Sequence, residues 1–306
     1  MNAAASSLSA LSIDLARAVA DAGPAIVYVD AHPRRDASGI AWDDHHIVTV
    51  DHAIEREDDI DIILANGRKT TARVAGRDPS TDIALLYTDT ALTPLRRARA
   101  EELAVGHLVL ALARDEDGAP AASFGIVSSL DGPWRTWRGG DVEQFIRPDL
   151  NLYASFSGGA LIDAEGALVG MNTWGLSRRT ALTLPVATLE RIANALRSGK
   201  RIARGYLGLA MQSVRLPGAL RAKLGREQTA AAIVVDVAPN GPADRGGVII
   251  GDVIVGLGTQ TIEDSDDVQR ALGGDSVGSV RTLHVVRGGE IRELAITIGE
   301  RPHDED

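Results

Sequence analysis

The sequence has no cysteine among its 306 residues. It can therefore form no disulfide bond, and it offers no thiolate to a zinc or iron–sulfur site. A chain without thiols is compatible with a reducing compartment.

Long apolar runs are also missing. No window reaches the roughly 18 to 20 continuous apolar residues that a membrane span requires. The first residues lack a basic start, and Asp14 and Arg17 interrupt the apolar pattern that follows, so they do not read as a signal peptide. We therefore expect no membrane span, no export signal and a cytoplasmic location.

Clusters of positive charge are absent too. The net charge is -10, from 32 Lys and Arg against 42 Asp and Glu. Nucleic acids and anionic membranes bind a basic surface, so neither is expected as the main partner. With 44% hydrophobic and 24% charged residues, the composition is that of an ordinary globular protein, and the length favours about two domains.

Short β-branched segments fill the first two thirds of the chain, after an amphipathic helix at 8–22 that Gly23-Pro24 ends. Asn66-Gly67 is a strong hairpin signal, and no helical period separates the strands, which favours antiparallel barrels over a βαβ fold. We expect two similar six-stranded antiparallel barrels, the first from strands at 25–29, 39–42, 46–50, 60–64, 70–74 and 83–87, the second from strands at 108–112, 123–130, 142–146, 160–162, 167–171 and 181–184.

A helix at 186–197, which Gly199 ends, and a basic linker at 200–204 lead into a C-terminal α+β region. In that region we expect strands at 206–214, 230–237, 280–286 and 291–298, the last two joined at Gly288-Gly289, and a helix at 264–272 capped by Asp264 or Ser265. The expected fold is mainly β: a helical segment at 1–23, two barrels at about 24–95 and 105–185 within a domain at 24–200, an α+β domain at 205–300, and a polar tail at 301–306.

Ser157-Gly-Gly, between a mixed segment and an apolar strand, contains the candidate nucleophile. A serine hydroxyl attacks a carbonyl only when a base takes its proton and backbone donors receive the developing negative charge. The glycines allow the tight turn that presents such donors. The same three residues also serve ordinary turns, so this motif alone is weak.

His52 follows one predicted strand and Asp82 precedes another. Singly, a surface histidine and a turn aspartate are the plainer interpretations. Together with Ser157 they form the set in which an imidazole takes the serine proton and a carboxylate fixes the imidazole tautomer. We therefore predict a catalytic triad of His52, Asp82 and Ser157 in a cleft between the barrels.

Metal binding is not expected. His45 and His46 lie beside Asp43 and Asp44, but adjacent residues on a strand point to opposite faces, and a solvated acidic turn is the better interpretation. No other group of residues suggests a metal or another cofactor.

Four blocks of the sequence resemble the HtrA (Deg) family of trypsin-like serine proteases that carry a C-terminal PDZ domain. The blocks contain Thr49-Val-Asp-His52-Ala-Ile, Asp78-Pro-Ser-Thr-Asp82-Ile-Ala-Leu-Leu, Ser157-Gly-Gly-Ala-Leu with the preceding Phe124-Gly-Ile-Val-Ser and Phe145-Ile-Arg-Pro-Asp149, and the stretch from Gly166 to Gly175 with Leu184-Pro185. The likeness covers residues 24 to 300.

The resemblance implies roles for further residues. The strand from Gly166 to Gly175 would line the specificity pocket, so Thr173, Trp174 and Gly175, with Asn151 ahead of the serine, would contact substrate. Gly205, Tyr206, Leu207 and Gly208 look like the PDZ loop that receives a peptide C-terminal carboxylate, and Asn240-Gly-Pro supports that likeness. Backbone N–H groups of such a loop can form an anion-binding nest, and the next strand can pair with a peptide.

The chain departs from the family pattern beside the nucleophile. Where the family usually has Gly-Asn before the serine, this chain has Ser155-Phe156, and Ala160 replaces a proline. The oxyanion hole would use backbone N–H groups of Ser155, Phe156 and Ser157. The family also implies a homotrimer, although the N-terminal segment lacks the aromatic residues that often mediate it.

Two functions follow from these features. The first is a serine endopeptidase that cleaves unfolded or damaged polypeptides through an acyl-enzyme on Ser157, with a PDZ domain that binds peptide C-termini. The second is a protease-like peptide-binding scaffold with a poorly formed oxyanion hole, for which Ser155-Phe156 is the only support.

Overall fold

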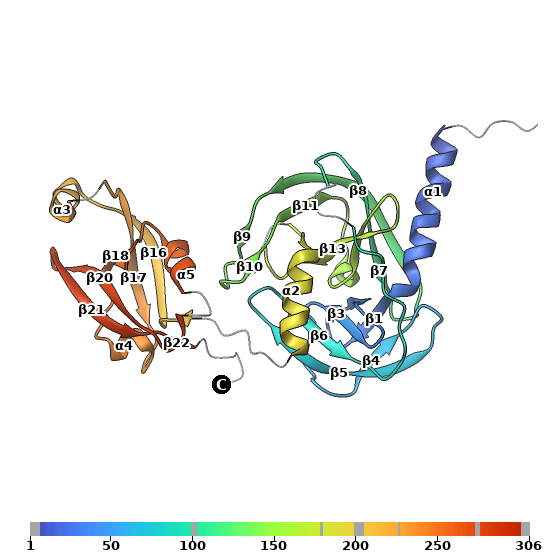
Figure 1. Ribbon diagram of the computed structural model, residues 1–306, viewed down its shortest axis with the longest axis horizontal. Helices are drawn as coiled ribbons and strands as arrows, with labels where there is room; N and C mark the ends of the chain where they lie inside the picture. Colours follow the sequence, from blue (N-terminus) through green and yellow to red (C-terminus); the bar gives the residue numbers. More distant parts are fainter. Residues whose placement is uncertain are drawn as a thin grey trace, which may run out of the picture. The chain divides into compact units, whose positions relative to one another are not determined.

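The computed structural model of the chain describes residues 7–98, 103–177, 180–198, 205–225, 227–272 and 276–300. The chain forms two compact units, Met1–Arg201 and Ile202–Asp306, which are described separately (Figure 1). The predicted linker at 200–204 and the predicted tail at 301–306 lie outside the described residues.

The first barrel of unit 1 closes in the strand order β1-β2-β3-β6-β5-β4. Gly67 closes the β4–β5 hairpin with φ +74°, and its N–H donates to the carbonyl of Leu64 at 2.9 Å. The barrel interior is apolar, with Val29, Ile40 and Ile62 fully buried. Its strands are β1 Ile26–Asp30, β2 Ala37–Ala41, β3 His46–Thr49, β4 Ile60–Ile63, β5 Lys69–Asp78 and β6 Ile83–Tyr87.

The second barrel closes in the order β11-β14-β13-β12-β7-β8. The predicted strand at 142–146 is divided by a bend at Glu143, whose N–H donates to the Thr188 hydroxyl and whose carboxylate accepts from Arg191, both in the helix at 186–197. The barrel strands are β7 Leu108–Arg114, β8 Pro120–Asp131, β11 Phe145–Asp149, β12 Ala160–Asp163, β13 Leu168–Thr173 and β14 Leu182–Pro185, and the short β9 Trp134–Arg135 and β10 Asp141–Val142 form a hairpin between β8 and β11.

Polar contacts join the two barrels. Arg114, at the end of β7, is almost fully buried and donates to the carbonyls of Ile26 at 2.6 Å and Gly23 at 2.7 Å in the first barrel's leading segment. Helix α2, Val186–Arg197, lies against β5 and β6 of one barrel and β13 and β14 of the other (Figure 1). Helix α1, Ser7–Ala22, and the 3-10 turn η1, Gly23–Ala25, precede the first barrel.

Unit 2 is built on the sheet β16-β17-β18-β20-β21. One face packs a core that includes Ala232, Ile254 and Val285, and the opposite face packs a smaller cluster that includes Val255 and Val286. Its elements are β15 Gly205–Tyr206, β16 Leu209–Arg215, α3 Gly218–Leu224, β17 Ala230–Val237, α4 Pro242–Arg245, β18 Val253–Leu257, β19 Gln260–Thr261, α5 Ser265–Ala271, β20 Val280–Arg287, β21 Glu290–Thr297 and β22 Gly299–Glu300.

The predicted fold class is confirmed: a mainly β chain with two closed six-stranded antiparallel barrels and an α+β unit after them. Of the two predicted caps of α5, Asp264 is the one used, in a capping box with Asp267. Helices α3 and α4 and strand β18 were not predicted.

Candidate active site

His52 and Asp82 meet at the edge of the first barrel. His52 lies in η2, a 3-10 turn over Asp51–Ala53 that follows β3, and Asp82 directly precedes β6. The imidazole Nδ1 lies 2.9 Å from both carboxylate oxygens of Asp82, and the His52 N–H donates to Oδ1 at 3.0 Å. A proton held on Nδ1 leaves Nε2 free to accept one, as a general base requires.

The turn before β6 holds Asp82 in an uncommon backbone conformation. Its φ is +58°, in the left-handed region that few residues other than glycine adopt. The buried Asp78 carboxylate accepts hydrogen bonds from the Ser80 N–H at 3.1 Å and the Thr81 hydroxyl at 2.8 Å, which fixes this turn. The carbonyl of Asp82 also accepts from the N–H of Asp51 at 3.2 Å. These bonds hold the strained residue in place.

Thr173 and Gly175, predicted to contact substrate, lie against the His52 and Asp82 pair. The Thr173 hydroxyl donates to Asp82 Oδ2 and accepts from the Gly175 N–H at 2.8 Å. A Cβ added to Gly175 would lie 2.3 Å from Asp82 Oδ2 and 2.8 Å from His52 Nδ1. Thr173 is 1% exposed, so its side chain supports Asp82 and does not face solvent.

Ser157 follows η4, a 3-10 turn over Ala154–Phe156, and precedes β12. Gly158 has φ +80°, and a Cβ there would lie 2.1 Å from the carbonyl of Ser38; a Cβ on Gly159 would lie 2.2 Å from that of Leu112. Only glycine fits either position, which explains the motif. The Ser157 Oγ accepts the Trp174 N–H at 3.3 Å, and within the described ranges no hydrogen bond joins Ser157 to His52.

Two of the three predicted oxyanion donors, Phe156 and Ser157, are engaged within the chain. The Ser157 N–H donates to the carbonyl of Ala154 at 3.2 Å, and the Phe156 N–H donates to that of Tyr153 at 3.0 Å. Ser155 lies inside the same turn and does not have a positive φ. The Ala154 carbonyl therefore takes the Ser157 donor that a substrate oxyanion would need.

Exposed side chains flank the serine. Tyr153 is 69% exposed and Trp174 is 41% exposed, on the two segments that bracket Ser157. Asn151, the other predicted substrate residue, is exposed in the irregular stretch between β11 and η4. Sequence reasoning missed Tyr153, and no pattern in the chain distinguished it.

The predicted carboxylate loop of unit 2 divides into two parts. Gly205 and Tyr206 pair with β22, and the Gly205 N–H donates to the carbonyl of Leu272 at 3.2 Å. Gly208 has φ +77°, which turns the chain into β16. Within the described part of unit 2, the N–H groups of Leu207 and Gly208 donate no hydrogen bond, so these two remain available to an anion.

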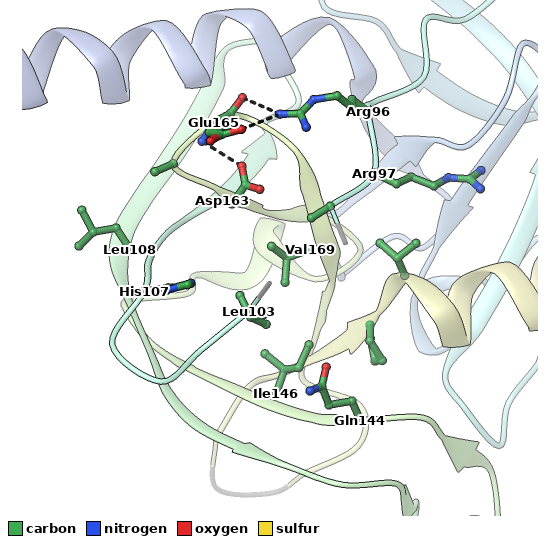
Figure 2. A pocket seen from close by; sticks show the side chains of 14 residues that line it. Arg96, Arg97, Leu103, His107, Leu108, Gln144, Ile146, Asp163, Glu165 and Val169 are labelled. Atoms are coloured by element: carbon green, nitrogen blue, oxygen red, sulfur yellow. Dashed lines mark hydrogen bonds and ion pairs between the residues drawn. The ribbon is translucent and has the colours of Figure 1, made fainter. Parts of the chain in front are cut away.

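A cavity of about 690 Å³ lies in the second barrel, at the opposite end of β12 from Ser157. In Figure 2 the apolar side chains of Leu103, Ile146 and Val169 project into it, and Arg96 pairs with Glu165 at its edge. None of the predicted site residues lines this cavity.

Within the described ranges, no group of three His, Asp or Glu side chains could hold a metal ion. His46 Nδ1 lies 2.8 Å from Asp43, and its ring meets that of Tyr87 edge-on. No helix in those ranges is long and apolar enough to cross a membrane.

Comparison with known families matches both units. The trypsin-like peptidase domain matches residues 37–171, and the PDZ domain matches residues 205–298. Unit 1 therefore contains the first domain, and unit 2 contains the second.

Two relatives of similar sequence carry names that describe serine endoproteases. The "probable periplasmic serine endoprotease DegP-like" of Pseudomonas putida is 31% identical over 268 residues, and that of Halomonas elongata is 30% identical over 269 residues. Each alignment covers 86% of this chain, but only 55% and 56% of the two relatives, so the chain spans about half their length. Their names contradict the expected cytoplasmic location, since both describe periplasmic proteins.

Solved structures agree in fold over nearly the whole chain. An HtrA-type protease, AlgW, bound to a decapeptide gives a TM-score of 0.72 at 27% identity and covers 94% of this chain and 99% of its own. A serine endoprotease from Yersinia pestis gives 0.72 at 26% identity, with 94% and 98% covered. The resemblance seen in the sequence is confirmed: the chain carries a trypsin-like peptidase domain followed by a PDZ domain, and the proteins similar to it across both are HtrA-type serine proteases.

Proposed function

We propose that the chain is a serine endopeptidase that cleaves unfolded or damaged polypeptides. Ser157 attacks the carbonyl, His52 Nε2 takes the hydroxyl proton and returns it to the leaving amine, and Asp82 stabilises the imidazolium. The result is an acyl-enzyme on Ser157, which water then hydrolyses. The observation that carries the proposal is the bond of His52 Nδ1 to both oxygens of a buried carboxylate beside the serine turn.

The described conformation is a resting state of this enzyme. Attack requires the Ser157 hydroxyl to leave the Trp174 N–H and turn to His52, and it requires the Ser157 N–H to exchange the Ala154 carbonyl for the oxyanion. Binding of substrate in the cleft, or of a ligand to the PDZ domain, supplies the free energy for that exchange.

Labelling with a fluorophosphonate tests the activity, because only an activated serine reacts with it. We expect labelling and casein hydrolysis in the natural chain and neither in Ser157→Ala or His52→Ala, with melting temperatures unchanged. A folded natural chain that neither labels nor cleaves, yet binds peptide, would establish the scaffold function instead. The engaged Ser157 N–H is the one observation in favour of that alternative.

We propose that the enzyme cuts after aliphatic residues. A pocket for lysine or arginine needs a buried carboxylate at its base. The segment leading into Ser157 carries the neutral Asn151, Ala181 and Leu182 are buried apolar residues, and Asp149 is exposed. Mapping the cleavage sites in casein by mass spectrometry tests this, and a majority of cuts after Lys or Arg would refute it.

The PDZ domain is proposed to bind peptide C-termini through the N–H groups of Leu207 and Gly208, which donate to no acceptor among the described residues. A peptide with a free apolar C-terminus should bind the full chain, and its amidated twin should bind at least about tenfold more weakly. Equal affinities by calorimetry would show that the loop is not a carboxylate site.

Two further proposals concern the setting. The relatives named as periplasmic favour action in the periplasm.

Self-association as a homotrimer is favoured by the exposed Leu8 and Ile13 of α1, which are 77% and 55% exposed. Light scattering on the intact chain tests the oligomeric state.

A further inference from the structure

A second buried carboxylate lies next to the catalytic histidine in the chain. Asp51 is 4% exposed and forms the first residue of η2. Its Oδ1 accepts a hydrogen bond from Arg77 Nε at 2.7 Å. The Arg77 guanidinium, which reaches over from β5, also donates to the carbonyl of Ile54 at 3.2 Å, just past η2. Arg77 therefore holds both ends of the turn that carries His52.

The two carboxylates are linked as well as close. The Asp51 N–H donates to the carbonyl of Asp82 at 3.2 Å, while the Asp82 side chain holds His52. Burial raises the pKa of the Asp51 carboxyl; the bond and charge of Arg77 oppose the rise, and the charge of Asp82 adds to it. The turn that carries His52 thus contains one buried carboxylate, Asp51, and binds a second, Asp82; Arg77 pairs with the first of them.

Several other charged side chains also lie near η2. Arg138, on the β9–β10 hairpin, lowers the pKa of Asp51 by its charge and lies over the Trp137 ring. Further charged groups near η2 include Arg35, which donates to the His52 carbonyl, and the exposed Glu55, which pairs with His32 at 3.8 Å.

We propose that Asp51 and Arg77 form a positioning pair that sets the basicity of His52 by balancing charge beside it. Removal of the Asp51 charge alone leaves an unbalanced cation, which disfavours the imidazolium and lowers the pKa of His52. Removal of both charges restores the balance. A purely structural role predicts something else: both variants would disturb η2, and the double variant would not recover.

The test is an NMR titration of the histidine Cε1 signals in the full chain with Ser157→Ala, which prevents self-cleavage. The chain has 7 histidines, and loss of one signal in His52→Gln identifies that of His52. Asp51→Asn should lower the His52 pKa by roughly half to one pH unit, and Asp51→Asn with Arg77→Met should return it to within about 0.3 unit of the starting value.

Glu143→Gln is the matched control, since it removes a carboxylate that also pairs with an arginine, on the link between β10 and β11. It should leave the His52 pKa unchanged. An unchanged value in Asp51→Asn, or a lowered value that persists in the double variant, would overturn the proposal.

The inference rests on His52 being the general base, but the titration does not need turnover. A protein with no peptidase activity would refute the proposed function and leave this measurement intact. In the active enzyme, the acid limb of the kcat/KM profile should move by the same amount and in the same direction as the His52 pKa.

Discussion

Gly175 has no side chain because the His52 and Asp82 pair fills the space beside it. Gly175→Ala should displace that pair and lower kcat/KM by about two decades or more, since small displacements of a catalytic group cost roughly that much. Gly132→Ala is the control, because a Cβ there meets nothing within 4 Å. Peptidase assays and fluorophosphonate labelling measure the effect, and a Gly175→Ala enzyme with the natural rate would contradict it.

Loss of the Thr173 hydroxyl should also affect the His52 and Asp82 pair. Thr173→Val removes the hydrogen bond to Asp82 Oδ2 and leaves the side-chain volume in place. A hydrogen bond to a charged group contributes about 1.5 to 3 kcal/mol, which corresponds to a loss of about one to two decades in kcat/KM. Thr173→Ser should keep most of the activity. Equal rates for the two variants would refute the role of the hydroxyl.

The contacts of Thr173 and Gly175 with the His52 and Asp82 pair could not be predicted from the sequence. His52, Asp82 and Ser157 were predicted as a triad because residue type and motif point to the same chemistry, and this assignment stays a prediction. The supporting bond from Thr173 joins residues 91 positions apart, and Gly175 meets the pair only through the fold. Both lay in a segment assigned to substrate contact by resemblance, and nothing in the local sequence distinguishes support from contact.

At the scale of elements, η4 holds the Ser157 N–H that the proposed oxyanion hole needs. To free the Ser157 N–H, the peptide between Ala154 and Ser155 must rotate so that the Ala154 carbonyl turns away from it. The Ser155 carbonyl belongs to the next peptide and keeps its hydrogen bond from the Ser38 hydroxyl, at 2.8 Å. If Ser155 reaches a positive φ when the hole opens, its side chain adds about 1 to 3 kcal/mol of strain.

Ser155→Gly removes that strain and should raise the rate on small peptides by about one to two decades with little change in melting temperature. Fluorophosphonate labelling should also become faster. Gly132→Ala, where an added Cβ meets nothing within 4 Å, serves as the control. Unchanged labelling and turnover would mean that Ser155 opens without penalty.

Most elements of both barrels were predicted from alternation and turn residues, because the strands have apolar faces and several of the turns contain glycine or asparagine, as Asn66-Gly67 and Gly118 do. The sequence did not reveal η4, whose Ala-Ser-Phe has no helical period. Helix α3 is also too short for periodicity, and it forms because Leu220 and Leu224 cover a second apolar face of the sheet. That face becomes visible only when β17, β18 and β20 lie side by side.

At the scale of whole units, unit 2 contains a buried ion pair between Asp252 and Arg287. Asp252 is fully buried and its two oxygens each lie 2.7 Å from Arg287. Burial raises the pKa of the Asp252 carboxyl, but the Arg287 bonds and the Ile249 N–H outweigh it, so the pKa is below its ordinary value.

A lowered carboxyl pKa stabilises the fold above the unfolded value of about 3.9 and ceases to do so as the pH falls through the folded value. Calorimetry of the full chain should show the melting of unit 2 falling below about pH 4. Asp252→Asn should melt lower at pH 7 and lose much of this dependence, whereas Glu290→Gln, at an exposed position, should keep it. An unaltered slope in Asp252→Asn would refute the assignment.

The hydrogen bonds of Arg114 link the first barrel to a part of the chain that the ribosome synthesises later. The first barrel's leading segment offers the carbonyls of Gly23 and Ile26 to a side chain that lies 91 and 88 residues later. Likewise, Ser38 binds the carbonyl of Ser157, which is synthesised later still. A ribosome-bound chain with only the first barrel exposed has His52 and Asp82 but neither Ser157 nor these braces. Under the proposed mechanism, we therefore expect no cleavage of neighbouring chains before the second barrel has folded.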